Sequence, residues 1–576
     1  MCSSDLYGTS LYSYEDLGGT GTGSSYYANQ SSSRNIYNDL VFNFNYDLTS
    51  KLNLKFNIGG NVQDRAFSVI TNGGTNLDVA GFYHISNVLN LDNISRLDNR
   101  KVNYRKVGAF ANVDLAYSDY LFLNATDRIE QSSTVEKSYM YPSVGLSFIP
   151  TKAFEMLKDS KLSYAKLNAS YTSVGNTSAV GPYNTNTVAV IPQGFPFGNL
   201  AAFGFNFNPT NPKIKPEFVN TLEVGGQLGF FNDRINLEGS YFVAKTKDLI
   251  SNATASSTSG ANTLLNNIGN LENKGFEIDL GLVPVKTQNF RWDLRTSYSA
   301  AKTKITSLGD VTSINLQSNT SIGIFAEVGE DFPLIKGTSF TRDPDGNIIV
   351  DANGVPLRES QFKRLGKATP DYIVGLTNSF EYKGLKLTAV ADFRTGGSVY
   401  SEAKNLLLFT GADYDATGFD RTQGYVVPGS VTSTGAVNTT TVANNPTYAG
   451  VLNYFTTTYR AVGEANVVDA TALKIRELSL SYALPKKMIE KAGLQSFRFG
   501  INARNPFVFL ADGKLIKPKN GLANNSYGDP ESSNTAAGVG PQNNPFRAGF
   551  GNAQGIMNIG QYPTTKTYGF SINVTF

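Results

Sequence analysis

The sequence predicts an all-β protein, an antiparallel transmembrane β-barrel, from three observations. About 15 segments of roughly 10 to 17 residues alternate apolar and polar side chains, a period of two that is typical of strands with one apolar and one wet face. Tyr, Phe and Gly are abundant, and only 17% of the residues are charged. Short and long connections alternate along the chain. A soluble sandwich has no reason to sort its connections in this way, whereas an outer-membrane barrel has short periplasmic turns and long external loops.

The first two segments form a hairpin with matched faces. Every second residue from 39 to 48 is apolar, and after the turn 49–51 the alternation continues from Leu52 to Ile58. Cross-strand neighbours on one face therefore share their polarity. Ten residues at roughly 3.3 Å each, tilted by about 40°, cover the ~25 Å apolar band of an outer-membrane barrel. The remaining segments are approximately 106–117, 120–130, 138–149, 161–174, 218–231, 234–249, 273–284, 289–305, 371–383, 385–396, 471–483, 495–509 and 567–576.

The lengths of the connections indicate which end of each strand is periplasmic and which is external. The short ones are 49–51, 118–119, 232–233, 285–288, 383–384 and 484–494, and the long ones are 62–105, 175–217, 250–272, 306–370, 397–470 and 510–566. If the short turns are periplasmic, the last strand descends and Phe576 lies on the periplasmic side. Because a single-chain barrel normally closes with an even number of strands, we expect an odd number of strands before residue 1. Residues 1–34 are then a truncated start and external loop, and residues 35–576 a partial barrel.

Composition excludes several classes of function. The 576 residues include one Cys (Cys2) and one His (His84), which rules out a disulfide framework, a CxxC zinc site and a His-rich metal site. Fifty Lys and Arg nearly balance 47 Asp and Glu, so no nucleic-acid partner is expected. No nucleophile stands beside a matching base, and His84 falls in a predicted external loop, where a solvated histidine is the default. We therefore expect no enzyme and no catalytic residues.

Five stretches resemble, in the same order, the C-terminal half of the SusC/RagA family of TonB-dependent outer-membrane transporters. They are "NPKIKPEFVNTLEVGGQLGFFNDRINLEGSYFVAKTKDLI" (211–250), "NIGNLENKGFEIDL" (267–280), "GKATPDYIVGLTNSFEYKGLKLTAVADF" (366–393), "VVDATALKIRELSLSYALPKKMIEKAGLQSFRFGINARNPFVF" (467–509) and "YPTTKTYGFSINVTF" (562–576). The stretches "GAFANVDLAYSDYLFLNATDRIE" and "YMYPSVGLSF" also match, so the likeness runs from about residue 35 to 576.

The resemblance implies a 22-stranded barrel, an N-terminal plug preceded by a TonB box, and a SusD-like surface lipoprotein as a lid. The family imports oligosaccharides, or in some members peptides, with energy passed from TonB, ExbB and ExbD. This chain departs from the family because the plug, the TonB box and the first strands are absent. As it stands it is expected neither to close nor to gate, and transport belongs to a full-length parent. The terminal strand resembles the signal that the barrel assembly machinery reads in outer-membrane proteins.

The two faces of the strands carry different candidate roles. If the apolar set faces lipid, the polar set lines the lumen, where amides with donors and acceptors suit sugar hydroxyls, peptide bonds and plain water alike. Candidate lumen residues are Asn43, Asn45, Asp47, Lys55, Asn57 and Asn61. The expected interfacial girdle residues are Tyr241, Trp292, Tyr298, Tyr482, Tyr568 and Phe576.

Three loop features leave alternatives open. In "DPDGNIIVDANG" the oxygens of Asp343, Asp345, Asn347 and Asp351 either hold Ca²⁺ or form two Asx-Gly turns, and the glycine and closing Glu of an EF-hand are missing. In "SYGDPESSN" the residues Asp529 and Glu531 are either a carboxylate pair or part of a turn. Loop aromatics either stack on sugar rings, contact the lid or pack locally; they are Phe195, Phe197, Phe203 and Phe205.

Three functions from different classes compete. The leading hypothesis is TonB-dependent import of an oligomeric nutrient by the full-length parent, an oligosaccharide or alternatively a peptide. The second is a passive pore or surface adhesin without a plug, and the third is a soluble β-rich enzyme or glycan-binding protein. A plug and TonB box upstream of residue 1 would separate the first from the second, and recovery from salt-washed outer membrane would exclude the third.

Overall fold

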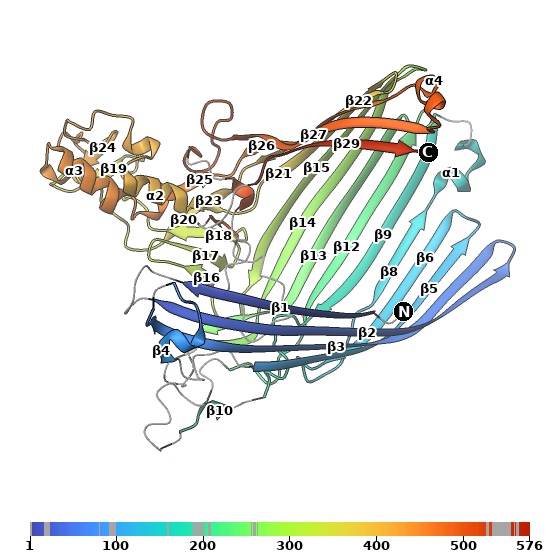
Figure 1. Ribbon diagram of the computed structural model, residues 1–576, viewed down its shortest axis with the longest axis horizontal. Helices are drawn as coiled ribbons and strands as arrows, with labels where there is room; N and C mark the ends of the chain where they lie inside the picture. The colour runs from blue at the N-terminus through green and yellow to red at the C-terminus, as the bar shows by residue number, and fades with distance from the viewer. Residues whose placement is uncertain are drawn as a thin grey trace.

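The computed structural model describes residues 3–15, 24–79, 81–91, 100–157, 161–186, 189–190, 200, 202–205, 209–254, 256, 258, 261, 263–525, 529–532, 554–557, 559 and 564–576, with the backbone alone for residues 3–15. Its main feature is one curved, 18-stranded sheet that wraps around a hollow (Figure 1). Beyond one end of this sheet stands a group of smaller elements, and at the other end the strands are joined by short turns (Figure 1).

Neighbouring strands of the wall are antiparallel, and most follow one another in the chain. The wall runs in the order β1 (Ser3–Glu15), β2 (Ser25–Thr49), β3 (Leu52–Leu77), β5 (Arg100–Tyr117), β6 (Leu121–Ser132), β8 (Ser143–Phe148), β9 (Leu162–Asn176), β12 (Glu217–Phe230), β13 (Ile235–Thr254), β14 (Thr263–Lys286), β15 (Phe290–Ser307), β21 (Tyr372–Tyr382), β22 (Leu385–Thr395), β26 (Ala472–Ala483), β27 (Ser496–Leu510) and β29 (Thr567–Thr575). Two short strands, β4 (Val88–Leu91) and β7 (Tyr139–Met140), extend β3 and β6. Within the described residues β1 pairs only with β2, and β29 only with β27, so these two strands are the edges of the sheet.

Each strand that the alternation predicts is present, and the all-β prediction is confirmed. The tight turns also have the backbone that a two-residue hairpin requires, because both central residues have positive φ at Ser118–Asp119 and at Lys383–Gly384. The C-terminus lies at the end of the wall that carries these turns, beside the short helices α1 (Pro150–Ala153) and α4 (Lys486–Ile489) (Figure 1).

Several strands are longer than the alternation predicts, and the difference falls at the long-loop end. The strand β2 spans 25 residues and begins at Ser25, and a further strand β1 lies in the stretch that the sequence analysis assigned to a start and a loop. The start of β2, "SYYANQSSSRN", is polar on both faces. A strand wetted on both sides has no period-two hydropathy signal, so alternation marks only the part that has an apolar face.

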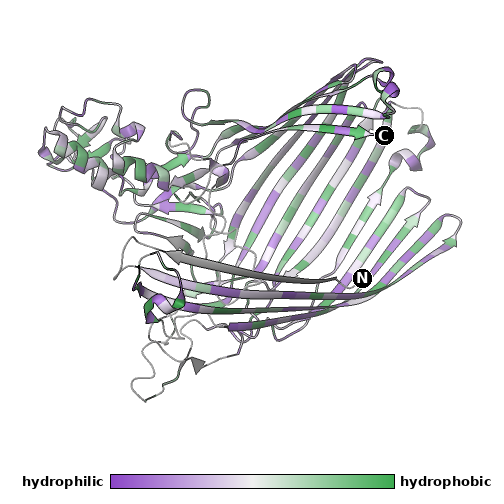
Figure 2. Cartoon of the chain, in the orientation of Figure 1, coloured by the Kyte–Doolittle hydropathy of each residue, from purple (hydrophilic) through white to green (hydrophobic). Residues whose placement is uncertain are grey.

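Figure 2 shows hydrophobic and hydrophilic residues alternating along the wall strands. The apolar set is exposed on the outer face rather than packed in a core, with exposed fractions of 63% for Leu40, 54% for Phe42 and 57% for Tyr46. A soluble protein rarely exposes a contiguous apolar surface of this extent. In the part of the chain that the structure describes, no helix has the length and apolar character needed to cross a membrane.

The long connections fold into compact units packed around buried hydrophobic clusters, some of which the units share. Residues 306–370 build a four-stranded sheet from β16 (Ser313–Ser318), β17 (Ile322–Glu327), β18 (Leu334–Gly337) and β20 (Lys363–Lys367). Residues 397–470 contain α2 (Glu402–Thr410) and α3 (Tyr448–Asn453) around a cluster that includes Leu408, Tyr454 and Phe455. The smaller strands are β10 (Ala189–Val190), β11 (Gly204–Phe205), β19 (Ile348–Val350), β23 (Ser398–Ser401), β24 (Ser430–Thr432), β25 (Val467–Asp469) and β28 (Ile556–Met557).

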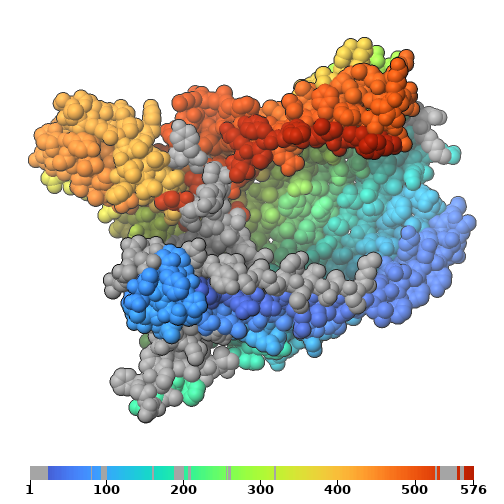
Figure 3. Space-filling model, viewed as in Figure 1, coloured from blue at the N-terminus to red at the C-terminus, as the bar shows by residue number. Residues whose placement is uncertain are grey.

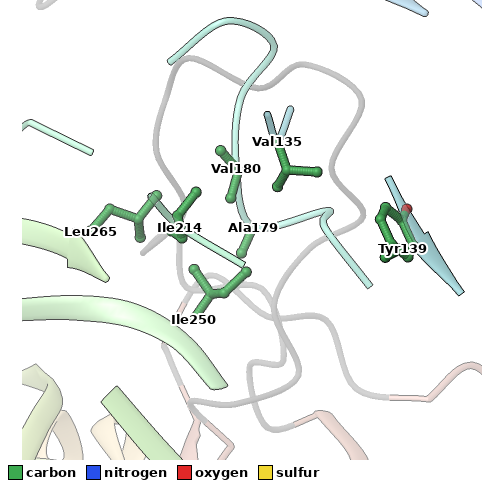
Figure 4. Packing of buried hydrophobic residues seen from close by; sticks show 7 residues of the cluster. All are labelled: Val135, Tyr139, Ala179, Val180, Ile214, Ile250 and Leu265. Atoms are coloured by element: carbon green, nitrogen blue, oxygen red, sulfur yellow. The ribbon is translucent and has the colours of Figure 1, made fainter. Parts of the chain in front are cut away.

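A third core joins loops that are far apart in the sequence. Its buried members come from the connections after β6 and β9, from β7 and from the long-loop ends of β13 and β14, and Figure 4 shows how they lie. They are Val135, Tyr139, Ala179, Val180, Ile214, Ile250 and Leu265. The long loops therefore form a packed rim on one end of the wall.

Candidate functional site

The inner face of β2, β3, β5 and β6 carries a band of amides. In successive rungs Asn45 faces Lys55, and Asn43 faces Asn57, which in turn faces Asn112 of β5. Hydrogen bonds run along and across the band: Asn53 Nδ2 donates to Asn45 Oδ1 and Asp47 Oδ1, both at 2.8 Å. Five of the six predicted lumen residues, Asn43, Asn45, Asp47, Lys55 and Asn57, thus lie on one face in adjacent rungs.

A second group on this face completes the band toward the long loops. Arg128 donates from Nη2 to Asn61 Oδ1 at 2.8 Å and forms an ion pair with Glu130 at 2.5 Å. Lys106 lies 3.1 Å from the same Glu130 carboxylate, whose side chain is only 4% exposed. The hydroxyl of Tyr37 accepts a hydrogen bond from Asn61 at 2.5 Å. The side-chain amide of Asn61 is therefore hydrogen-bonded through both its oxygen and its nitrogen. One N–H and one oxygen lone pair are left for a ligand.

Three cavities of about 940, 530 and 440 Å³ lie against the inner wall. The largest is lined by the predicted residues Asn45, Asp47 and Lys55 and by residues of strands further around the wall, such as Lys166 and Glu238. Figure 3 shows the hollow between the red C-terminal strands and the blue strands, with the green and cyan strands behind it. Asn43 and Asn57 lie one rung further from the short turns.

Two arginines that line the smaller cavities are paired with carboxylates of the same face. Arg295 Nε lies 2.8 Å from Asp279 Oδ1 on the neighbouring strand, and Arg291 Nη2 lies 2.7 Å from Asp293 Oδ1. These guanidinium groups are 69% and 48% exposed, so water screens each pair. The wall therefore offers a ligand neutral amides, paired charges and further carboxylates such as Glu223, Glu238 and Glu277.

Two inner aromatics were not predicted. The rings of Phe110 and Phe242 lie over Gly59 and Gly275 of the adjacent strands, where an added Cβ would come within 2.7 Å and 2.6 Å of ring atoms. Arg128 also lies over the Phe110 ring, 5.7 Å from its centroid. In the sequence, each of these residues is a Phe at a polar position of the alternation. This position indicates an inner aromatic packed on the wall only once the strand register shows a glycine opposite it.

The loop that carries Asp529 and Glu531 is fixed to the wall by cations of β26. Lys474 Nζ lies 2.5 Å from Asp529 Oδ1 and 2.7 Å from Glu531 Oε2, and the lysine side chain is 1% exposed. Arg476 forms ion pairs with Glu531 and with Asp392 of β22. Arg476, with Lys474, lowers the pKa of Glu531 to about 2, and Lys474 and the Thr564 hydroxyl lower that of Asp529 despite its burial. The two carboxylates meet at one lysine.

The predicted girdle residues lie on the outer face, and some of them stack on other aromatic side chains. Trp292 stacks on Phe380 of β21 and donates from Nε1 to Asn378 Oδ1 at 2.8 Å. Tyr298 stacks on Phe276 and Tyr372. The remaining girdle residues are Tyr241, Tyr482, Tyr568 and Phe576, of which Tyr241, Tyr568 and Phe576 are 47%, 74% and 82% exposed. A membrane-interface role for these residues stays a prediction.

The carboxylates of the candidate calcium segment are engaged in turns. Asp343 Oδ1 accepts from the backbone N–H of Asp345 and Asn347, and its other oxygen accepts from Asn347 Nδ2. Asp351 Oδ1 accepts from the N–H of Asn353 and Val355 in the same way. These hydrogen bonds lower the pKa of Asp343. The structure thus forms the two Asx turns, and in the described parts of the chain no cluster of three metal-ligating acidic, His or Cys side chains occurs.

The structure describes some of the other loop candidates. His84 is exposed and caps a 3₁₀ turn by accepting from Ser86 N–H. Phe203 is 76% exposed, and Phe205 belongs to β11. Phe195, Phe197 and Cys2 lie outside the described residues. Their predicted roles stay predictions.

Comparison with known proteins identifies the wall. The profile of the family described as TonB dependent receptor-like, beta-barrel, matches residues 3–505. TonB-dependent receptor P26 of Formosa agariphila is 27% identical over 546 residues, which cover 89% of this chain and 50% of that protein. TonB-dependent receptor SusC of Bacteroides thetaiotaomicron is 28% identical over 286 residues, 46% of this chain and 28% of that protein. The chain spans about half the length of P26.

The fold is similar to that of solved transporters. A chain of the RagAB peptide transporter superimposes with a TM-score of 0.70 at 18% identity, covering 96% of this chain and 56% of its own length. In the closed-closed state of the RagAB peptide importer the TM-score is 0.72 at 16% identity, with 100% and 59% covered. At these identities the likeness shows the fold. The family profile, the relatives and the outward apolar face together establish that this chain belongs to the TonB-dependent receptor-like β-barrel family, as a SusC/RagA-like outer-membrane protein of a Gram-negative bacterium and not an enzyme.

Proposed function

We propose that the parent of this chain imports oligosaccharides across the outer membrane in a TonB-dependent manner. The observation that carries the proposal is the amide band of the inner wall, whose rung Asn45–Lys55 lines a cavity in the hollow of a family barrel and whose rung Asn43–Asn57 comes next to it. Beside this band Arg128 is paired with Glu130, and the band itself presents the amides of Asn43, Asn45 and Asn57 together with the charged Asp47 and Lys55. Amides pair well with the hydroxyl groups of a neutral sugar chain.

The partners of the import reaction follow from the same proposal. A plug and a TonB box would come from the part of the parent that this chain does not span, and TonB, ExbB and ExbD would supply the energy. A SusD-like surface lipoprotein would sit as a lid on the packed rim of long loops, and the barrel assembly machinery would read β29. The RagAB likeness supports a two-component importer of this kind, and it keeps peptides as the second candidate substrate.

The transport test uses the native host. Uptake of a fluorescent oligosaccharide is measured in wild type, in a strain without the parent gene and in a strain without TonB. Import by this protein predicts that both deletions abolish uptake. Uptake that persists without TonB but requires the parent gene would identify a passive pore, and a deletion strain that loses only surface attachment would identify an adhesin.

The substrate test uses the purified full-length protein with its lid partner. Oligosaccharides and oligopeptides of similar length are titrated by calorimetry into wild type and into Asn57→Leu, with Ile58→Leu on the outer face as the matched control. The proposal predicts binding of the oligosaccharide and a loss of roughly 1 to 3 kcal/mol in Asn57→Leu, since one polar partner is left unpaired. Binding of the peptide alone would overturn the sugar assignment without touching the transport proposal. Neighbouring glycoside hydrolase genes would agree with a sugar, and peptidase genes with a peptide.

A further inference from the structure

Four lysines gather on the outer face of β13, β14 and β15, near the middle of β13 and β14 and toward the long-loop end of β15. In one rung Lys245 faces Glu272, which faces Lys304, and in the next rung Lys274 faces Lys302. We call Lys245, Lys274, Lys302 and Lys304 the lysine cluster. It uses adjacent positions of three neighbouring strands, so the four ammonium groups emerge from one patch of wall.

The register shows that this patch is on the outer face. One rung closer to the short turns lie Tyr241 and Phe276, and the next rung joins Ile278 to Tyr298. Tyr241, Phe276 and Ile278 are 47%, 41% and 41% exposed, as expected for side chains that face lipid. The intervening residues of β14, Glu277 and Asp279, line a cavity of the inner wall instead. Side chains alternate along a strand, so the lysines share the face of the aromatics.

The cluster carries an excess of positive charge that water can reach. Glu272 lies 2.7 Å from Lys274 Nζ and 3.7 Å from Lys245 Nζ, and Asp331 lies 3.2 Å from Lys302 Nζ. Four lysines thus share two carboxylates. The side chains of Lys245, Lys274 and Lys302 are 58%, 50% and 57% exposed, so their ammonium groups keep donors available for another anion.

The position of the cluster relative to the rows of aromatic residues indicates which kind of anion it would bind. Aromatic side chains mark the boundary between the acyl chains and the head groups of a membrane. Two residues along a strand advance roughly 6.6 Å, so the lysines lie one to three rungs beyond that boundary, at the depth of the lipid head groups. The apolar rows of Tyr241, Phe276 and Ile278 below would contact acyl chains of the same molecule.

We propose that the lysine cluster binds the phosphate groups of a phosphorylated glycolipid of the outer leaflet, of the lipopolysaccharide class. The lysines contact the head-group phosphates, and the aromatic rows pack against the attached acyl chains. A lysine ammonium group binds phosphate as a point charge with no fixed orientation. This suits a mobile lipid better than the two parallel hydrogen bonds that an arginine would form. Glu272 spaces the lysines and keeps them from repelling one another when no lipid is present. The assignment does not depend on what the lumen transports.

The test uses the full-length protein, purified from its outer membrane in mild detergent. The cluster variant replaces Lys245, Lys274, Lys302 and Lys304 by Gln. The matched control replaces four exposed lysines at the short-turn end, Lys51, Lys486, Lys487 and Lys491, by Gln. Both remove four positive charges, and heat-modifiable gel migration confirms that each variant is folded. Bound lipid is measured by native mass spectrometry after addition of purified lipopolysaccharide, of its enzymatically dephosphorylated form, or of inorganic phosphate as a competitor.

The proposal makes a distinct prediction for each arm. Wild type and control retain the phosphorylated lipid, and the cluster variant binds it at least ~10-fold more weakly, since each lysine near a charged lipid surface contributes about 1 kcal/mol. The dephosphorylated lipid binds wild type as weakly as the intact lipid binds the cluster variant. Equal binding of the lipid to all three proteins would overturn the proposal, and so would displacement of the lipid by millimolar inorganic phosphate, which would identify a free-anion site instead.

Discussion

Lys474 is the residue on which the loop of Asp529 and Glu531 depends. Its ammonium group contacts both carboxylates while the side chain is 1% exposed, so it supplies the positive charge that makes burial of Asp529 tolerable. Removing one partner of a buried ion pair costs much more than the pair contributes, because the other charge remains without compensation. A loop that looks like an ordinary turn in the sequence is therefore an electrostatic attachment point on β26.

The variant Lys474→Met is expected to detach residues 529–532 from the wall. Breaking such a buried pair costs roughly 3 to 5 kcal/mol, and the loss is local because the strand β26 keeps its ladder. Hydrogen exchange of the full-length protein should show faster exchange at 529–532. Lys486→Met, at a 77% exposed lysine, is the control and should leave this exchange unchanged. Unaltered exchange in Lys474→Met would contradict the anchoring role.

The same loop should detach in acid. Glu531 has a folded-state pKa of about 2, lowered from 4.5, and the pKa of Asp529 is also lowered. A carboxyl whose pKa is depressed by folding contributes stability above its ordinary pKa, and that contribution disappears as the pH falls through the folded value. We expect exchange at 529–532, corrected for the intrinsic rate, to be constant from pH 8 to 5 and to rise between about pH 4.5 and about 2. In Arg476→Gln the folded-state pKa of Glu531 lies closer to its ordinary value, so the rise should be smaller and end at a higher pH, and a rise at neutral pH in wild type would contradict the assignment.

At the scale of the strand, alternation separates a lipid face from a lumen face. Phe44 stacks on Phe56 of the paired strand and on Tyr46, while Asn43 points to the opposite side. The two positions are adjacent in the chain and differ only in the face they occupy. They provide a matched pair for testing the orientation of the sheet.

Phe44→Arg is expected to destabilise the full-length barrel, and Asn43→Arg is not. A charge on the lipid face costs roughly 2 to 4 kcal/mol near the bilayer midplane, whereas a lumen position keeps the charge in water. The measurement is the unfolding free energy in liposomes from denaturant titration. A larger loss in Asn43→Arg than in Phe44→Arg would reverse the assignment of the two faces.

The strands were predictable because a membrane wall imposes a strong local signal, and the face that a side chain occupies was predictable only where it follows that signal. Asn45, Asp47 and Lys55 lie on a cavity because alternation placed them on the polar face. The network of Asn61 with Arg128 joins residues 67 positions apart, and Lys474 meets Asp529 across 55 positions. Register over such separations depends on loop lengths that carry no hydropathy pattern. The polar first part of β2 was missed for a related reason, since both of its faces are wet.

At the scale of the molecule, the sheet ends in two edges. Within the described residues β1 and β29 each have one neighbour, so their outer N–H and C=O groups lack a strand partner. In lipid each unsatisfied backbone group costs several kcal/mol, and only closed barrels avoid this cost. The open wall therefore requires additional strands to become a stable membrane structure.

This 576-residue chain expressed alone should not give a heat-modifiable barrel, whereas the full-length parent should. The reason is the pair of open edges, which pair with other copies and aggregate when nothing covers them. The measurement compares gel migration with and without boiling after extraction from the outer membrane. A compact, heat-modifiable species from the chain alone would show that β1 and β29 can close on each other.

The 25 residues of β2 have a consequence for where the protein meets its surroundings. At roughly 3.3 Å per residue and a tilt of about 40°, β2 is some 60 Å tall, against an apolar band of ~25 Å. More than half of the strand must then stand above the bilayer, with the packed rim of loops on top. The opening at this end of the wall therefore lies well above the lipid head groups, within reach of molecules that stay outside the lipid layer.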